Sequence, residues 1–281
     1  MRRQRLNNLK PPRKQMSKNN FVLIRGGGDL ATGVALRLQR AGIQVVISEL
    51  AQPLAVRRTV SFSEAVYEGQ HTVEGVTARL IKADQLSAWN KADEIPLLVD
   101  PNADILASFI FPVIVDARLI KQPPAPLPTQ VALHIGLGPG FTAGNDCHAV
   151  IETRRSHTLG RVYWTGTTQP DSGEPEGDPR RVLRAPSEGV IMGLKKIGKH
   201  VEAGEVLAVI NLQHSVISPF AGVLRGLIHD GLQVTKGMKI GDVDVRDEAS
   251  LCQLVSDKAL AIGGGVLEAI LSKREIREQL F

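Results

Sequence analysis

The chain has 281 residues, 43% of them apolar, and a net charge of +5. This length allows one large domain or two medium ones, and no apolar run approaches the ~20 residues of a membrane helix, so membrane insertion is not expected. Two cysteines, Cys147 and Cys252, are too few for a disulfide framework and favour a reducing, cytoplasmic setting.

The positive charge is concentrated at the N-terminus. Residues 1–15 hold six Lys and Arg and no acid, and without them the net charge falls from +5 to −1. A basic segment with so little apolar content cannot form a core, so residues 1–20 are predicted to be a disordered leader. It could be a nucleic-acid arm, a targeting peptide or an over-extended start before Met16, and we favour the third. The remaining chain has no basic patch that indicates nucleic acid.

Residues 21–165 are predicted to form a Rossmann-like α/β domain. The apolar run 21–24 is typical of a strand that is buried on both faces. A helical pattern then runs through residues 34–38 and stops at Gly42, and residues 43–47 form the next strand. This order predicts a β-α-β unit with glycines at its first turn.

The first turn has the glycine spacing of a dinucleotide-binding site. Gly26, Gly27 and Gly28 would let the backbone approach a pyrophosphate at the helix N-terminus. Glu49, which ends the second strand, could bond a ribose hydroxyl. Asp29 begins the helix, where a carboxylate could cap the first turn or oppose a phosphate. The turn therefore predicts either a nucleotide-type cofactor or a strand-to-helix turn without a ligand.

Further α/β units follow along the chain. The pattern predicts strands at 76–81, 96–99 and 112–115, a helix at 83–91 and a proline-rich extended connector at 121–129. Asp100 and Asp116 each end a strand, and in an open parallel sheet such ends face the ligand crevice. Each aspartate could equally cap the segment after it.

A dense cluster of glycines and reactive side chains follows a strand at 131–135. Gly136, Gly138 and Gly140 could form an anion nest, and Asp146, Cys147 and His148 are the candidate catalytic residues. Cys147 could be a metal ligand, a nucleophile or a sulfur or selenium relay, or it could be a small buried packing residue. The spacing does not indicate a zinc site.

A polar linker at 166–181 leads into an internal repeat. A shift of 33 residues aligns 186–209 with 219–242 at eight identical positions, which are turn glycines, a proline and apolar strand residues. Two such units predict a small all-β pseudo-twofold sandwich over 182–246 that resembles biotinyl/lipoyl domains. Its junction has no lysine, so no biotin or lipoate is expected. Residues 247–281 would pack a helical segment back on the first domain, with three glycines, 263–265, before the helix.

Several of these motifs together resemble a known family. The sequences at 24–33, at 57–58 with 62–66, at 140–148 with 151–153, and at 261–269 are similar to those of selenium-dependent molybdenum hydroxylase accessory proteins, which are related in type to xanthine dehydrogenase accessory proteins. The resemblance implies a cytoplasmic maturation factor that interacts with a molybdenum hydroxylase apo-enzyme. It also implies a Rossmann-like domain.

The leading hypothesis is therefore an accessory protein that binds a nucleotide-bearing cofactor. That cofactor would be a dinucleotide, either molybdenum pterin dinucleotide or NAD(P). An NAD(P)-dependent oxidoreductase is one alternative, on the strength of the segment from Gly26 to Glu49. A non-catalytic scaffold or interaction module is the other, on the strength of the repeat. Whether the protein is an enzyme stays open.

Overall fold

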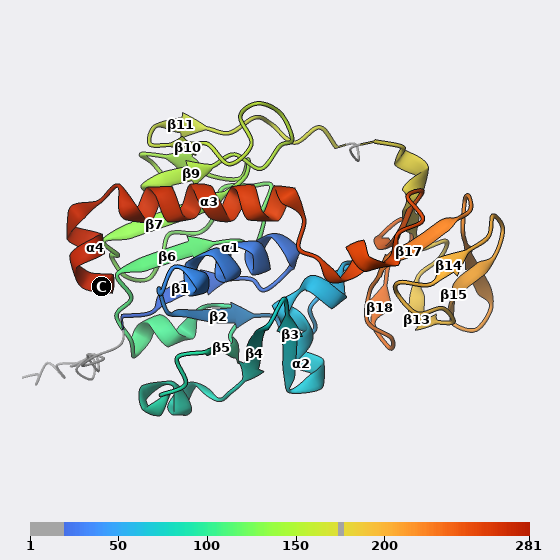
Figure 1. The fold of residues 1–281 in the computed structure, drawn as a ribbon, viewed down its shortest axis with the longest axis horizontal. Coiled ribbons are helices and arrows are strands. Elements are labelled where there is room, and N and C mark those ends of the chain that lie inside the picture. The colour runs from blue at the N-terminus through green and yellow to red at the C-terminus, as the bar shows by residue number, and fades with distance from the viewer. Residues whose placement is uncertain (1–19, 174–176) are drawn as a thin grey trace, which may run out of the picture.

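The computed structural model describes residues 20–173 and 177–281, so almost all of the predicted leader and part of the predicted linker lie outside the described residues. These residues form two lobes (Figure 1). One lobe is built on a large sheet with helices, and the other contains strands from 182 to 244.

The large sheet of the first lobe, here called the α/β lobe, has nine strands. Seven strands from β9 to β4 run parallel, and the edge strands β10 and β3 are antiparallel to their neighbours. In spatial order the strands are β10 (Val162–Tyr163), β9 (Ala149–Ile151), β7 (Leu133–Leu137), β6 (Val113–Asp116), β1 (Val22–Arg25), β2 (Val45–Glu49), β5 (Glu94–Val99), β4 (Val76–Leu80) and β3 (Gln70–Val73).

The two faces of this sheet are covered differently. Two long helices, α1 (Asp29–Arg40) and α3 (Asp257–Leu271), lie side by side on one face, and α4 (Arg274–Leu280) follows α3 (Figure 1). The other face packs on the 3₁₀ turns η3 (Ala83–Ala88) and η4 (Asp104–Ala107). Since the connections after β2 and β5 contain short turns rather than long helices, most helical cover comes from the two ends of the chain.

Shorter elements complete this lobe. They are η1 (Arg58–Val60), η2 (Phe62–Glu64), the short helix α2 (Ala65–Glu68), the paired strands β8 (Thr142–Ala143) and β11 (Gly166–Thr167), and η6 (Ala249–Gln253). None of the described helices is long and apolar enough to cross a membrane.

The second lobe, the β-lobe, consists of two four-stranded antiparallel sheets. One has the order β12 (Val182–Arg184), β19 (Lys239–Asp244), β17 (Gly222–Leu227), β14 (His200–Val201), and η5 (Pro179–Arg181) precedes it. The other has the order β16 (His214–Ile217), β15 (Val206–Ile210), β13 (Gly189–Gly193), β18 (Gln233–Val234). The 33-residue shift superimposes β13, β14 and β15 on β17, β18 and β19 in sequence.

The predicted layout of a Rossmann domain plus a biotinyl/lipoyl-like sandwich was wrong. The large sheet is mixed, because a β3–β4 hairpin and the antiparallel strand β10 occupy its edges. The β-lobe is a separate antiparallel unit in which each sheet takes a short strand from the other half of the repeat. Two element predictions also failed. Residues 83–91 contain a 3₁₀ turn rather than an α-helix, and the glycines at 263–265 lie inside α3.

Candidate functional site

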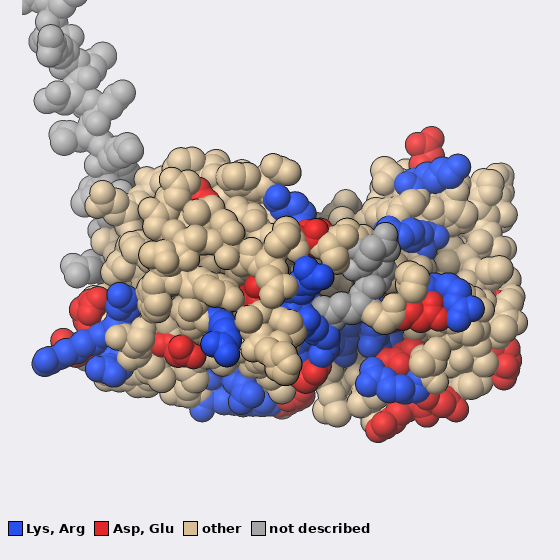
Figure 2. Space-filling model, turned by 90° about the horizontal axis from the view of Figure 1, so that it is seen from above, with Lys and Arg blue, Asp and Glu red and all other residues tan. Residues whose placement is uncertain are grey.

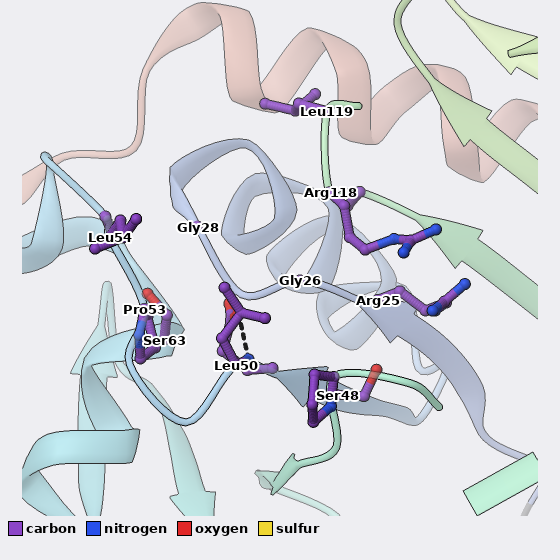
Figure 3. Close-up of a pocket in the computed structure, with 14 residues that line it drawn as sticks. Arg25, Gly26, Gly28, Ser48, Leu50, Pro53, Leu54, Ser63, Arg118 and Leu119 are labelled. Atoms are coloured by element: carbon purple, nitrogen blue, oxygen red, sulfur yellow. Dashed lines mark hydrogen bonds between the residues drawn. The ribbon is translucent and has the colours of Figure 1, made fainter. Parts of the chain in front are cut away.

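A cavity of about 280 Å³ opens at the carboxyl ends of β1, β2 and β6 (Figure 3). From β1 the chain builds the sheet outward through β2, and it later returns to the other side of β1 with β6. Open α/β sheets bind ligands where the strand order reverses in this way. We call this cavity the crevice. It is lined by Arg25, Gly26, Gly28, Ser48, Glu49, Leu50, Pro53, Leu54, Ala55, Ser63, Pro101, Ala117, Arg118 and Leu119.

The glycine turn after β1 forms one wall of the crevice, and its three glycines have different reasons to be glycine. Gly26 has a φ of +96°, which other residues rarely adopt. A Cβ on Gly27 would lie 3.0 Å from the Ser63 amide nitrogen. A Cβ on Gly28 would meet nothing within 4 Å. Gly28 therefore leaves open space that a ligand can occupy.

The N-terminus of α1 begins at this turn without a side-chain cap. Gly28 is the N-cap residue and the terminus has no side-chain cap, so of the two alternatives left open for Asp29 the structure does not bear out capping. Its carboxylate Oδ2 lies 3.8 Å from Arg57 Nη1 instead. The ion pair offsets the negative charge beside the helix terminus. The first-turn N–H groups thus remain for a ligand or for water.

Glu49 is turned inward from the end of β2. Its Oε2 accepts a hydrogen bond from the Gly27 amide and its Oε1 accepts one from the Leu50 amide, each at 2.6 Å. The side chain is buried, and this burial raises the pKa of the carboxyl group, although the two backbone donors act against the shift. Each oxygen keeps a lone pair that can accept a hydroxyl from a ligand.

Two arginines share one buried carboxylate on the far side of the crevice. Arg118 contacts both oxygens of Asp116 at 2.8 and 2.6 Å, and Arg25 Nη1 lies 3.3 Å from Oδ2. Asp116 is fully buried, and burial lowers the pKa of Arg25. Two positive charges against one negative charge leave this wall cationic. The sequence pointed to Asp116 and gave no sign of its partnership with Arg25.

Ser63 is a candidate site residue that was not predicted from the sequence. It lies on η2, is 1% exposed and lines the crevice (Figure 3). Its amide donates to the Gly27 carbonyl at 2.9 Å, which holds it against the glycine turn. Its hydroxyl has no hydrogen-bond partner within the described residues. Ser63 lies in the motif 62–66, one of those that carry the family resemblance, but it is 35 positions after Gly28 and nothing in that motif indicates that the two residues lie together.

The predicted catalytic residues Asp146, Cys147 and His148 lie outside the crevice. Cys147 is buried and its Sγ donates to the Ala149 carbonyl at 3.2 Å. Burial raises the pKa of its thiol to about 11, which opposes the thiolate that a nucleophile or relay needs. His148 is exposed, and its Nδ1 accepts the His134 amide. Asp146 accepts the Thr142 amide. These contacts are those of a packed turn.

The predicted glycine nest at Gly136, Gly138 and Gly140 does not line the crevice either. A Cβ on Gly136 would overlap the Phe141 ring, and one on Gly140 would overlap the Ile120 carbonyl. Gly138 has a φ of +83°. Close packing and backbone conformation account for these glycines. Across residues 20–173 and 177–281, no group of three His, Cys, Asp or Glu side chains is arranged to hold a metal ion.

A search of curated proteins found one clear relative. The chain is 46% identical over 260 residues to the uncharacterized protein YqeB of Escherichia coli K12, a match that covers 91% of this chain and 48% of the relative. The chain thus spans about half the length of the curated relative it matches. No protein-family model matches.

Solved structures overlap only loosely with this one. A product-bound ectoine utilization protein EutE (DoeB) from Ruegeria pomeroyi is 19% identical over 28% of this chain and 27% of that chain, with a TM-score of 0.22. A succinylglutamate desuccinylase/aspartoacylase from Rhodobacter sphaeroides is 18% identical over 29% and 30%, with a TM-score of 0.21. An aspartoacylase family protein from Mesorhizobium loti is 14% identical over 82% and 86%, with a TM-score of 0.26. Overlaps this loose carry no argument about chemistry.

These comparisons overturn the family prediction. The curated relative is uncharacterized and no family model matches, so no comparison supports a molybdenum hydroxylase accessory protein. The predicted maturation role in a selenium-dependent molybdenum hydroxylase system was therefore wrong, and the predicted apo-enzyme partner has no support. The oxidoreductase and scaffold alternatives fit no better. The function has to be argued from the crevice itself.

Proposed function

We propose that the α/β lobe binds a small phosphorylated molecule of nucleotide type in the crevice. The observation that carries this proposal is the buried Ser63 hydroxyl, which has no partner in the described chain and lies beside the uncapped terminus of α1. A buried hydroxyl without a partner is costly, and a phosphate oxygen would supply one. The first-turn amides of α1 would donate to the same group.

The other walls suit the remainder of a nucleotide. Glu49 can accept hydroxyls of a sugar, and Arg25 supplies a positive charge behind the phosphate. Leu50, Leu54 and Leu119 give apolar surface for a base (Figure 3). Apolar lining with a few convergent polar groups is the usual make-up of a small-molecule site, and about 280 Å³ lies just below the usual range of such sites.

The test is equilibrium binding of inorganic pyrophosphate and of AMP, GMP, CMP and UMP to the full chain. Gly28→Val places a branched side chain in the open space at the helix terminus and should reduce phosphate binding at least about tenfold. Gly264→Val is the matched control, because a Cβ there also meets nothing and the residue lies on α3. Equal affinity in both folded variants would exclude this phosphate position.

Ser63→Ala is a second test, because it should weaken phosphate binding without lowering the free energy of unfolding. Removing a buried, unpartnered hydroxyl should leave the free energy of unfolding unchanged or raise it slightly. Losing a hydrogen bond to phosphate should weaken binding by about 1–2 kcal/mol, or roughly tenfold. A variant that is destabilised and binds phosphate normally would show that Ser63 supports the fold alone.

A further inference from the structure

A second and larger cavity of about 960 Å³ adjoins the crevice, and we call it the interlobe cleft. Its walls come from both lobes, and three of its lining residues, Gly28, Leu54 and Ala55, also line the crevice. Gly28, whose Cβ position is open, is therefore one of the residues at which the two cavities adjoin. A ligand with its phosphate at this point has space on both sides.

The interlobe cleft is suited to negative charge. Among the described residues that line it, Lys and Arg outnumber Asp. Figure 2 shows Lys and Arg side chains on both lobes beside the hollow between them. One of these basic side chains, Arg225, is fixed by two ion pairs, with Asp242 at 2.8 Å and with Asp244 at 3.0 Å. Both aspartates are buried. Arg225 is thus held in position before any ligand arrives.

Arg57, on the loop that leads into η1, lines the interlobe cleft and lies beside Asp29, the residue that follows Gly28. Its Nη2 donates to the carbonyls of Leu251 and Leu254, and its nearest carboxylate oxygen, on Asp29, is 3.8 Å away. Its Nε has no partner within the described residues. Burial lowers the pKa of this guanidinium, which is held with an incompletely offset charge. A phosphate at Gly28 would supply the negative charge that the Arg57 guanidinium lacks.

The interlobe cleft also exposes apolar side chains that the fold itself does not cover. Val245 is 64% exposed, Leu254 49% and Leu54 46%, and all three line this cavity. Exposed apolar side chains grouped around a charged cavity mark a binding surface. They would contact the flat face of a base, while the basic side chains face the phosphates.

We propose that the ligand is a dinucleoside diphosphate, with one nucleoside in the crevice, the diphosphate at Gly28 and Arg57, and the second nucleoside in the interlobe cleft. This inference rests on the proposed function, and it adds the second half of the ligand and the contribution of the β-lobe. Two linked halves that bind adjoining sites should bind more tightly than either half alone.

The test compares each mononucleotide with the symmetrical dinucleoside diphosphate of the same base, by calorimetric titration of the full chain. For at least one base, the dinucleoside diphosphate should bind at least about tenfold more tightly than its mononucleotide. Gly28→Val should weaken both ligands, since both place a phosphate at that position.

Two variants in the interlobe cleft should act on the longer ligand alone. Lys239→Gln removes a cationic group that lies 3.9 Å from Asp242, which keeps its contacts with Arg181 and Arg225. Val245→Glu adds negative charge to the wall. Both should abolish the dinucleoside advantage and leave mononucleotide affinity unchanged. Lys236→Gln and Val190→Glu, at exposed positions outside this cavity, are the matched controls and should leave both affinities unchanged.

The outcomes separate the two proposals. If mononucleotides bind through Gly28 but the longer ligands gain nothing, or keep their gain in Lys239→Gln and Val245→Glu, the interlobe extension is wrong and the crevice stands. If neither class binds, or Gly28→Val leaves both affinities unchanged, the crevice proposal fails and the extension fails with it.

Discussion

His134 carries a buried imidazole that the fold keeps neutral. The residue is 5% exposed, its Nε2 has no partner in the described chain, and its ring meets Phe141 edge-on at 6.1 Å between centroids. Burial lowers the pKa of its imidazole to about 4, and nearby Asp116 opposes the shift only in part. The strand β7 therefore places a titratable group where a charge is costly.

The stability of the protein should fall as the pH drops from about 6.5 to about 4. A folded-state pKa below the unfolded value means that the unfolded chain binds the proton more readily, so stability is present above pH 6.5 and lost through this window. At about 1.4 kcal/mol per unit, the loss from His134 is about 3 kcal/mol. Chemical denaturation at several pH values measures it.

His134→Leu should flatten this part of the pH profile, because the titrating group is gone. His157→Gln, at an exposed position, is the control and should keep the profile of the wild type. A His134→Leu profile that retained the whole slope between pH 6.5 and 4 would assign the loss of stability to other groups.

Glycines illustrate how far single residues could be interpreted from sequence. The turn Gly26 to Gly28 was identified from its spacing, and the structure places it on the crevice. Gly136 and Gly140 looked equally functional, and they are glycine because Phe141 and Ile120 fill the space of a Cβ. The spacing of glycines in the sequence does not show whether a Cβ at each position would meet open space or neighbouring atoms. That difference depends on residues that approach only in three dimensions.

At the scale of elements, apolar runs predicted the parallel strands well. The predicted strands at 43–47, 76–81 and 112–115 correspond to β2, β4 and β6 within two residues at each end, since both faces of such strands are buried. The edge strand β3 was missed, because its burial is partial and its sequence has no long apolar run. The pattern of apolar residues indicates which segments are buried, so it detects edge strands poorly because they are only partly buried.

The glycines of α3 show tertiary packing overriding local preference. A Cβ on Gly263 would lie 2.6 Å from the Gly33 carbonyl oxygen on α1, so the two helices cross in near-backbone contact. Glycine in a helix interior costs about 1 kcal/mol relative to alanine. The three glycines were predicted to precede the helix, as the glycines of the first turn do. Close packing of α1 on α3 compensates for that cost.

This packing predicts opposite effects for neighbouring alanines. Gly263→Ala should lower the free energy of unfolding by about 1–3 kcal/mol, because the new methyl group overlaps the α1 backbone. Gly264→Ala, one residue later and facing open space, should raise it by about 0.5–1 kcal/mol through helix propensity. Denaturant titration of both variants measures the difference. Equal effects would show that α1 and α3 do not cross so closely.

At the scale of the whole molecule, the repeat correctly indicated a separate β-rich unit, but not how it meets the α/β lobe. Tyr67 stacks on His229 with ring centroids 4.0 Å apart, and Arg58 Nε donates to the Leu227 carbonyl at 3.1 Å. These pairs lie more than 150 residues apart in the chain. No local pattern encodes such contacts, and so the interlobe cleft could not be predicted from the sequence.

The contact between the lobes should be sensitive to one further glycine. A Cβ on Gly226 would lie 2.7 Å from the Val56 carbonyl oxygen, and backbone at that distance has to move. Gly226→Leu should therefore push the lobes apart.

For this variant we expect a larger radius of gyration in small-angle scattering. In calorimetry we expect an unfolding transition at a lower temperature or divided in two, because separated lobes unfold as separate units. Ser215→Leu, exposed on β16, is the control and should change neither. A Gly226→Leu protein with the scattering and unfolding of the wild type would mean that the contact with Val56 does not fix the lobes. With the interlobe cleft widened, the same variant should also lose the dinucleoside advantage while mononucleotide binding in the crevice remains.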